Sequence, residues 1–281
     1  MQPKFISWQL IKDVIVKIIS AALVSIALQL ATNAAHADQA TLNTRSGNDI
    51  GLFFSSYKYE EPEIMSFKGG KMGLELHSTR MVPNEHFIRG DLRFAFGLVD
   101  YNSNGTGSAT GELDWYIEAR GLIGIDLEIK DAVLSPYTGL GYRYLFNDAR
   151  GITNTGNWGY RRESNYLYLP FGVIHRRMLN AQARLVSTLE YDRLLAGKQT
   201  SRLSDGGQGY SDVTNYQSNG YGLKLSFMYE RNDRAIGPYA HYWNIARSET
   251  AMTYQNGVQV GTGWEPDNNT IELGMKASHH F

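Results

Sequence analysis

Cysteine is absent from the 281-residue sequence. This absence excludes disulfide frameworks, thiolate zinc sites, iron–sulfur clusters and cysteine nucleophiles. A dominant charge is absent as well, because 27 basic residues stand against 28 acidic ones. Proteins that bind nucleic acid present a basic surface, so we expect no nucleic-acid partner. The adjacent His279 and His280 give no metal site, because neighbouring strand residues point to opposite faces. We expect neither a metal ion nor another cofactor.

Long apolar runs are missing after residue 37, where no segment reaches the roughly 18 consecutive apolar residues of a membrane-spanning helix. The start of the chain has the layout of a secretory signal peptide. A basic stretch around Lys12 comes first, an apolar run covers Ile18–Ala31, and Ala35 and Ala37 give an A-x-A cleavage pattern. The sequence therefore predicts a cleaved leader, 1–37, and a single exported domain, 38–281.

Glycine, aromatic residues and a two-residue alternation are what the sequence has in abundance. It contains 29 glycines, 18 tyrosines, 11 phenylalanines and 5 tryptophans. Apolar residues occupy every second position in many segments, which is the period of a strand with one apolar face. Ten candidate strands follow, at about 48–59, 69–81, 87–101, 111–127, 134–146, 165–176, 182–196, 219–230, 236–247 and 269–281.

The connections between these segments alternate in length. Longer polar connections lie near 60–68, 102–110, 147–164, 197–218 and 248–268, and short ones lie near 82–86, 128–133, 177–181 and 231–235. Long loops on one side and short turns on the other are typical of an outer-membrane barrel with both termini in the periplasm. Residues 252–260, around Asn256-Gly257, are expected to form a hairpin above the bilayer.

Strand length separates a membrane barrel from a soluble β-sandwich, which also alternates. Sandwich strands usually have five or six residues, whereas these alternations run over about 9 to 13, the length that crosses a bilayer at a tilt. The sequence predicts an all-β, antiparallel, up-and-down transmembrane barrel of about ten strands. Eight or twelve strands are alternatives, because 238–246 has an ambiguous face.

Aromatic residues are expected to form two girdles where the strands meet the lipid headgroups. The outer girdle comprises Tyr57, Tyr59, Tyr101, Trp115, Tyr144, Phe146, Tyr166, Tyr191 and Tyr221. The periplasmic girdle comprises Phe87, Tyr137, Phe171, Phe227, Tyr229, Tyr239 and Phe281.

The last strand alternates as Ile271, Leu273, Met275, Ala277, His279 and Phe281 and ends the chain on an aromatic residue. With the leader and the strand pattern, it resembles the small single-chain β-barrels of the Gram-negative outer membrane, of the OmpA, OmpX, Opa and OpcA kind. The resemblance implies an outer-membrane location, contact with membrane lipid and lipopolysaccharide, and a monomer. It also implies that Phe281 is similar to the signal read by the barrel-assembly machinery.

Charges of both signs occupy the face opposite the apolar one, which would line the lumen. The predicted lumen ion-pair residues are Glu75, Asp91, Arg93, Asp114, Glu118, Arg120, Arg143, Arg184, Glu190, Asp192, Lys224, Glu272 and Lys276. Eight strands are just filled by side chains and roughly 16 are needed for an aqueous channel, so ten leave little space. We expect an ion-paired interior that holds the barrel in shape. A narrow porin or channel for a small solute is the alternative.

An outer-membrane hydrolase is the less favoured alternative. Enzymes on similar barrels use a histidine near the outer rim, because histidine exchanges protons near neutral pH. Here His86 and His175 fall at periplasmic turns, and His77 and His241 lie within strands. A carboxylate pair could act without histidine, but no spacing singles one out among Asp100, Glu112, Asp114, Asp148, Asp192, Asp205 and Asp212. We predict that the protein is not an enzyme.

The outer loops are the expected working surface, because a rigid scaffold commonly carries its function on loops. Aromatic and arginine residues dominate binding hot spots. The candidate binding residues are Arg150, Trp158, Arg161, Arg162, Arg202, Tyr210, Tyr254 and Trp264. The sequence thus predicts a structural or surface-interaction role of an adhesin-like kind, with loops that bind an extracellular glycan or protein.

Overall fold

The computed structural model describes residues 42–281, and the predicted leader and its cleavage site lie outside the described residues. The described residues belong to one compact unit. Its long strands are β1 (Gly47–Glu61), β2 (Met65–Val82), β3 (His86–Ser103), β4 (Gly107–Ile125), β6 (Ala132–Asp148), β7 (Arg161–Asn180), β8 (Ala183–Ser201), β10 (Gly220–Arg231), β11 (Arg234–Ile245) and β14 (Asn268–His280).

Shorter elements extend the long strands or lie in the loops. They are β5 (Leu127–Ile129), β9 (Val213–Gln217), β12 (Ala251–Gln255), β13 (Val258–Gly263) and the 3-10 turn η2 (Leu203–Gly206). Within residues 42–281, no helix has the length and apolar character needed to cross a membrane.

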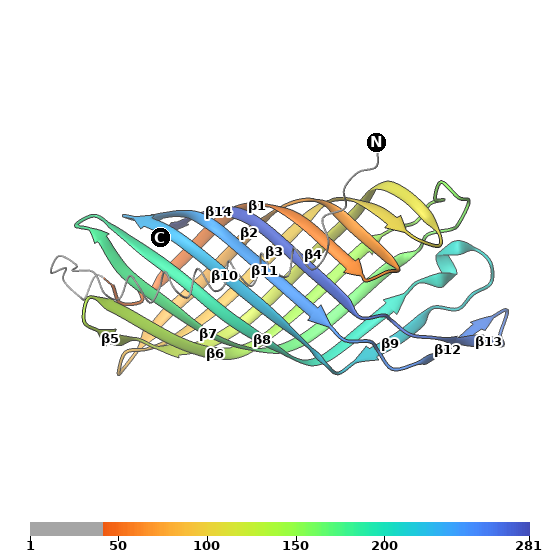
Figure 1. Ribbon diagram of the computed structural model, residues 1–281. Coiled ribbons are helices and arrows are strands. Elements are labelled where there is room, and N and C mark those ends of the chain that lie inside the picture. The colour runs from red at the N-terminus through yellow and green to blue at the C-terminus, as the bar shows by residue number, and fades with distance from the viewer. Residues whose placement is uncertain (1–41) are drawn as a thin grey trace. The chain divides into compact units, whose positions relative to one another are not determined.

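The ten long strands close into a ring of antiparallel neighbours (Figure 1). The ring closes where β1 pairs with β14, from Asp49↔His280 to Glu60↔Asn269. β10 pairs with β8 up to Tyr221↔Arg193, and β9 takes over as the partner of β8 nearer the loops. The predicted all-β barrel of ten strands is confirmed, and the alternatives of eight and twelve strands are wrong.

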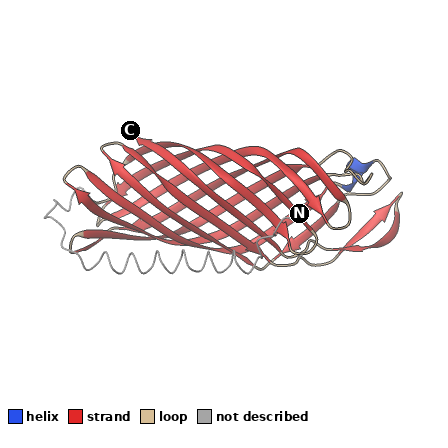
Figure 2. Cartoon of the chain, turned by 45° about the horizontal axis from the view of Figure 1, so that its top comes forward, coloured by secondary structure: helices blue, strands red, loops and turns tan. Residues whose placement is uncertain are grey.

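The faces of this barrel are the reverse of those of a water-soluble protein. Large apolar side chains stand exposed around the outside, among them Leu52, Phe54, Leu74, Phe94, Leu98, Ile123, Leu140, Phe171, Ile236, Leu273 and Met275. Charged side chains are buried inside. Because a closed sheet leaves no unpaired edge, it can carry this apolar belt through lipid. The strands therefore span a bilayer, tilted against the barrel axis as Figure 2 shows.

The first two outer connections are shorter than the sequence predicted. β1 ends at Glu61 and β2 begins at Met65, while β3 ends at Ser103 and β4 begins at Gly107. The long loops expected at 60–68 and 102–110 are therefore wrong. Small and polar residues there suggested a loop, but a strand that continues above the bilayer is wet on its outer face and uses the same residues. The other three outer connections are long, as predicted, and lie at the end opposite the C-terminus (Figure 1).

Several aromatic residues assigned to the girdles lie inside the barrel instead. The buried side chains are those of Tyr57, Tyr166, Phe87, Tyr137 and Tyr239. Tyr59 packs against the buried cluster that contains Tyr57. The abundance of aromatic residues near the strand ends did not reveal whether each ring faces the lipid or the lumen. The interior accommodates these rings by placing glycine opposite them, since a Cβ added to Gly172 would stand 2.2 Å from the Tyr137 ring. The buried Tyr168 ring is accommodated in the same way, because a Cβ added to Gly141 would stand 2.2 Å from it.

We predict that Gly141→Val destabilises the barrel by about 1 to 3 kcal/mol, because the added side chain collides with the Tyr168 ring. Gly121→Val is the matched control, because an added Cβ there meets no atom within 4 Å. The measurement is the urea midpoint of unfolding, followed by heat-modifiable gel migration. Equal midpoints for the two variants would contradict the packing described here.

Candidate binding site at the outer mouth

Ion pairs and aromatic rings fill the middle of the lumen. Arg93 lies between two carboxylates, in contact with Glu75 and with its Nη2 2.6 Å from Glu272 Oε1. Its Nε donates to the Tyr116 hydroxyl over 2.8 Å. The Arg93 guanidinium carbon also lies 3.6 Å from the centroid of the Phe53 ring. All of these groups are buried, so the charge of Arg93 is fully compensated within the protein.

A second ion-paired cluster lies next to the first. Lys224 Nζ is 2.7 Å from Glu118, 3.1 Å from Glu190 and 3.3 Å from Asp192. Arg120 donates to Glu190 over 2.6 Å. Lys224 thus faces three carboxylates, two of which it shares with Arg120.

Each predicted lumen ion-pair residue has an oppositely charged partner no more than 3.9 Å away. Sequence reasoning missed Lys71, which contacts Asp114 and is fully buried at its side chain. The sequence did contain an indication of this position. Lys71 and Glu75 are an even number of residues apart on the same strand, so both face the lumen, to which Glu75 was assigned.

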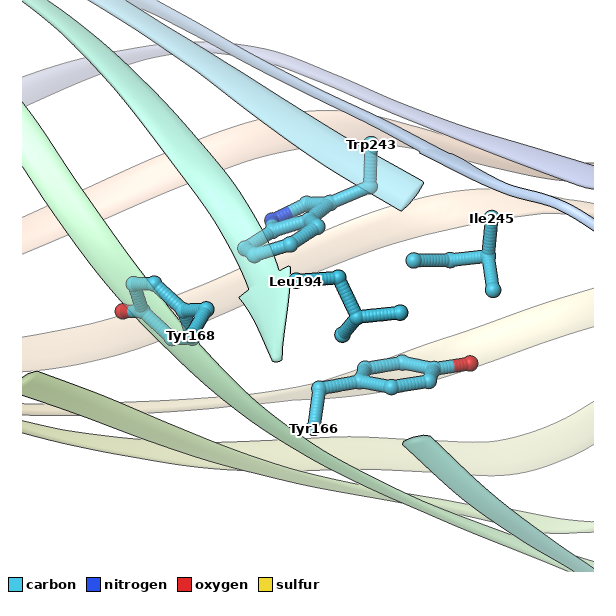
Figure 3. Packing of buried hydrophobic residues seen from close by; sticks show 5 residues of the cluster. All are labelled: Tyr166, Tyr168, Leu194, Trp243 and Ile245. Atoms are coloured by element: carbon cyan, nitrogen blue, oxygen red, sulfur yellow. The ribbon is translucent and has the colours of Figure 1, made fainter. Parts of the chain in front are cut away.

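Aromatic and aliphatic side chains cap these ion pairs toward the outer end. Tyr166, Tyr168, Leu194, Trp243 and Ile245 form one buried cluster (Figure 3). The Trp243 ring meets Tyr168 edge-on at 5.1 Å between centroids and stacks on Tyr166 at 6.3 Å. With the ion pairs below it, this cluster occupies the centre of the barrel, where a cavity of about 80 Å³ remains among Arg93, Arg120 and Lys224.

The segment before β1 narrows the periplasmic end. Thr44 donates from its backbone nitrogen and its hydroxyl to Asp126, over 2.6 and 2.8 Å. Arg45 pairs with Glu230 and Asp233 at the β10–β11 turn. The segment therefore joins two separate parts of the wall, and Thr44 and Arg45 line the cavity of about 160 Å³ that remains there.

A larger pocket of about 400 Å³, called here the mouth pocket, lies at the outer end. Four charged residues line it: Glu61 at the end of β1, Glu112 on β4, Arg162 at the start of β7, and Glu265 just before β14. Its aromatic lining residues are Phe67, Tyr101, Trp158, Tyr160 and Trp264. Strand ends and loops far apart in the sequence thus meet around one hollow.

Arg162 joins two of these carboxylates. Its Nη2 contacts the Oε1 atoms of both Glu61 and Glu265. The Tyr59 hydroxyl lies 3.0 Å from the first oxygen and 3.1 Å from the second. The Arg162 guanidinium carbon is 5.4 Å from the Tyr59 ring centroid and 5.9 Å from that of Phe67. The Arg162 guanidinium therefore pairs with two buried carboxylates and also lies near the faces of two aromatic rings.

Burial raises the pKa of Glu265, and the neighbouring charge of Glu61 raises it further, against the opposing effect of Arg162. A carboxylate that shares its cation with a second carboxylate is only partly compensated.

Glu112 is the least satisfied carboxylate of the mouth pocket. Its side chain is 8% exposed. Its Oε2 atom has no hydrogen-bond partner among residues 42–281. A buried carboxylate oxygen without a donor is costly, so it is a natural place for a ligand donor to dock.

The predicted binding residues divide into two groups. Trp158, Arg162 and Trp264 line the mouth pocket. The other five tie the loops together or lie on the hairpin: Arg150 pairs with Asp148, Arg161 with Asp205, Arg202 with Glu163 and Asp212, Tyr210 bridges to Gln255, and Tyr254 lies on β12. The hydrogen bond from Arg161 lowers the pKa of Asp205, which keeps this loop contact ionised near neutral pH.

The hairpin expected around Asn256-Gly257 is present as β12 and β13, which form a sheet of their own. Backbone hydrogen bonds join it to the preceding loop: the Asn256 N–H donates to the Gly209 carbonyl, and the Ser211 N–H donates to the Tyr254 carbonyl. The two long outer connections 202–219 and 246–267 therefore support each other beside the pocket.

Of the carboxylates considered for catalysis, Glu112 lies near Asp114 and Asp148, whereas others are held by different groups. Asp100 accepts a hydrogen bond from the Gly111 backbone, Asp114 contacts Lys71, and Asp192 lies beside Lys224. Among the described residues, no histidine lines the mouth pocket.

Sequence reasoning missed Glu61 and Glu265, the two carboxylates held by Arg162. A signal existed, since both precede a proline, as Glu61-Pro62 and Glu265-Pro266. These two Glu-Pro pairs flank the strands that close the barrel, β1 and β14. Their meeting depends on barrel closure, which no local pattern reveals.

No known family model matches the sequence, and no curated protein matches it either. Solved structures do match. The outer membrane protease OmpT from Escherichia coli is 12% identical, with a TM-score of 0.58 over 84% of this chain and 96% of that chain. The transport unit of the autotransporter AIDA-I from Escherichia coli is 9% identical, with a TM-score of 0.46 over 93% and 97%. At 12% identity the likeness to OmpT concerns the fold alone.

The apolar belt, the closed barrel and this likeness agree. The chain is an outer-membrane β-barrel, and the predicted location in the outer membrane of a Gram-negative bacterium is confirmed.

We predict that Arg93→Ala destabilises the barrel by about 3 to 5 kcal/mol, because Glu75 and Glu272 lose their cation in a buried site. Arg150→Ala is the control, since its pair with Asp148 is exposed and its loss should change little. Urea unfolding followed by gel migration measures both. If the two variants unfold at the same urea concentration, the lumen is more hydrated than described here.

The raised pKa of Glu265 predicts a pH dependence of the loop that contains it. A raised pKa in the folded state gives a stabilising contribution that is complete below the unfolded value of 4.5 and is lost as pH rises through the folded pKa. Loop 246–268 should therefore loosen with rising pH in the wild type, whereas Glu265→Gln should remove this trend.

Limited proteolysis of the folded barrel, from about pH 4 to about pH 8, measures this effect as the ratio of cleavage rates between wild type and variant at each pH. Glu249→Gln is the control, because Glu249 is exposed in the same loop. A ratio that stays constant across the pH range for Glu265→Gln would refute the prediction.

Proposed function

We propose that this outer-membrane β-barrel is a cell-surface binding protein whose outer loops capture an extracellular glycan or protein in the mouth pocket. The observation that carries this proposal is the contrast between the two parts of the interior. Ion pairs and rings occupy the centre of the lumen and leave a cavity of about 80 Å³ there, while the pocket of about 400 Å³ at the outer end is lined with residue types that bind ligands.

The composition of the pocket supports binding. Trp158, Tyr160 and Trp264 provide large rigid contact surfaces, and aromatic residues of this kind contribute most of the binding energy at interfaces. Ion pairs such as Arg161–Asp205 hold the surrounding loops in place before a ligand arrives. Because less conformational freedom is then lost on binding, affinity improves.

The same observations favour binding over transport and catalysis. The buried pairs of Arg93 and Lys224 lie in the path that a solute would take, and breaking them leaves buried carboxylates without partners. The mouth pocket lacks a histidine among its described lining residues, so its arrangement supports a binding site in preference to a hydrolase.

The membrane context follows from the same proposal. The exposed belt would contact lipid and lipopolysaccharide, and the barrel would act as a monomer because a closed sheet offers no free edge for pairing. Phe281 stays the predicted signal for the barrel-assembly machinery.

The test uses fluorescently labelled refolded barrel on arrays of surface glycans and extracellular-matrix proteins. We expect binding by the wild type and a loss of roughly tenfold or more on changing both Trp158 and Trp264 to alanine, because their contact area in the pocket is lost. Tyr216→Ala is the control, since Tyr216 is 60% exposed and lies outside the pocket lining. Binding that survives the double substitution would place the function elsewhere on the molecule.

A further inference from the structure

The charges of the mouth pocket do not balance. Glu61, Glu112 and Glu265 face a single cation, Arg162. Two carboxylates are therefore uncompensated when all three are ionised. Elsewhere at this end, Arg150, Arg161 and Arg202 each pair with loop carboxylates. The Arg247 guanidinium lies 4.0 Å from the centroid of the Trp264 ring.

Arg162 does not supply the missing donor to Glu112. Within the described residues its hydrogen bonds go to Glu61, Glu265, the Tyr59 hydroxyl and the sulfur of Met65. The Asn147 side chain is a hydrogen-bond partner of Glu112 and also donates from Nδ2 to Asp114 over 3.3 Å, but it does not reach the Oε2 atom of Glu112. The buried Oε2 of Glu112 thus lacks a donor within the described part of the chain. This atom is an observation independent of the charge count, and it points to a donor that comes from outside.

The walls of the pocket suit a cation. The guanidinium of Arg162 already lies over the rings of Tyr59 and Phe67, at 5.4 and 5.9 Å. Aromatic faces attract cations through their ring quadrupole, more strongly where water is excluded. Phe67, Tyr101 and Tyr160 line the same hollow as Glu112.

From this geometry we infer that the mouth pocket binds a ligand through a cationic nitrogen group, which donates to Glu112 while the body of the ligand packs against the aromatic wall. This inference rests on the proposed binding function and names the chemistry of its ligand: an ammonium or guanidinium group. A free amine, an amino sugar or a basic side chain could supply that group. An anionic or purely neutral ligand would leave the carboxylate oxygen without a charged partner.

The test compares matched probes on the refolded wild-type barrel. Glucosamine is paired with N-acetylglucosamine, and butylguanidine is paired with butylurea, so that the members of each pair differ chiefly in their charge. A short peptide with one lysine is compared with the same peptide acetylated at that lysine. Binding is followed by tryptophan fluorescence, since Trp158 and Trp264 line the pocket, and by calorimetry. We expect each cationic probe to bind roughly tenfold or more tightly than its uncharged partner, with an affinity that falls as salt is added.

Glu112→Gln keeps the size of the side chain and removes its charge. It should abolish the preference for cationic probes, whereas Glu63→Gln should keep it, because Glu63 is exposed at the neighbouring turn and does not line the pocket. If Glu112→Gln fails to fold, the matched probes on the wild type still decide, because they require no variant.

The outcomes separate this inference from the proposed function. Equal binding within each probe pair, or a preference for the uncharged member, overturns the cationic ligand but leaves a binding pocket. If no probe binds while the arrays show binding that depends on Trp158 and Trp264, the cationic ligand is also wrong and the binding function stands. If the small cationic probes fail but the lysine peptide binds, the inference holds and the source of the cation is a polypeptide.

Discussion

The need to pair every charge that the strands turn inward governs the rest of this structure. A two-residue alternation places apolar side chains against lipid and, by the same geometry, places their neighbours in a narrow lumen where water is scarce. Arg93, Arg120 and Lys224 are tolerated there because carboxylates from other strands meet them within hydrogen-bonding distance. Barrel closure is what brings those partners together, since Arg93 and Glu272 are 179 positions apart in the chain.

At the outer mouth, in contrast to the lumen, the inward-facing charges are not all paired. Below it, each of the predicted ion-pair residues has a partner of opposite charge, and rings such as Trp243 pack above these pairs. At the mouth, Arg162 serves both Glu61 and Glu265, and Glu112 keeps a buried oxygen without a donor. A role in stabilising the fold does not account for a buried carboxylate oxygen that lacks a donor, in a pocket whose surrounding loops are held by ion pairs. A partner from outside the cell would complete it, which is why the proposed function and the nature of its ligand depend on the same residues.

The sequence predicts the fold well because the signal is repeated in every strand. Ten alternating segments define ten strands, and their parity assigns residues such as Arg93 and Glu190 to the lumen. Parity does not say how far a strand continues above the bilayer, so the first two loops were predicted too long. The candidate site was only half predictable: Trp158, Arg162 and Trp264 could be found from loop composition. Glu61 and Glu265 could not, because they meet only through closure of the sheet between β1 and β14.

The central claim is that the lumen is closed and that the outer mouth does the work. Conductance of the refolded mature chain in a planar lipid bilayer tests it most directly, with heat-modifiable gel migration to verify that the barrel is folded. The account predicts no steady conductance from a folded barrel, because the ion pairs around Arg93 and Lys224 occupy the path. Regular channels of a defined size from the same preparation would contradict it and make solute transport the function to pursue.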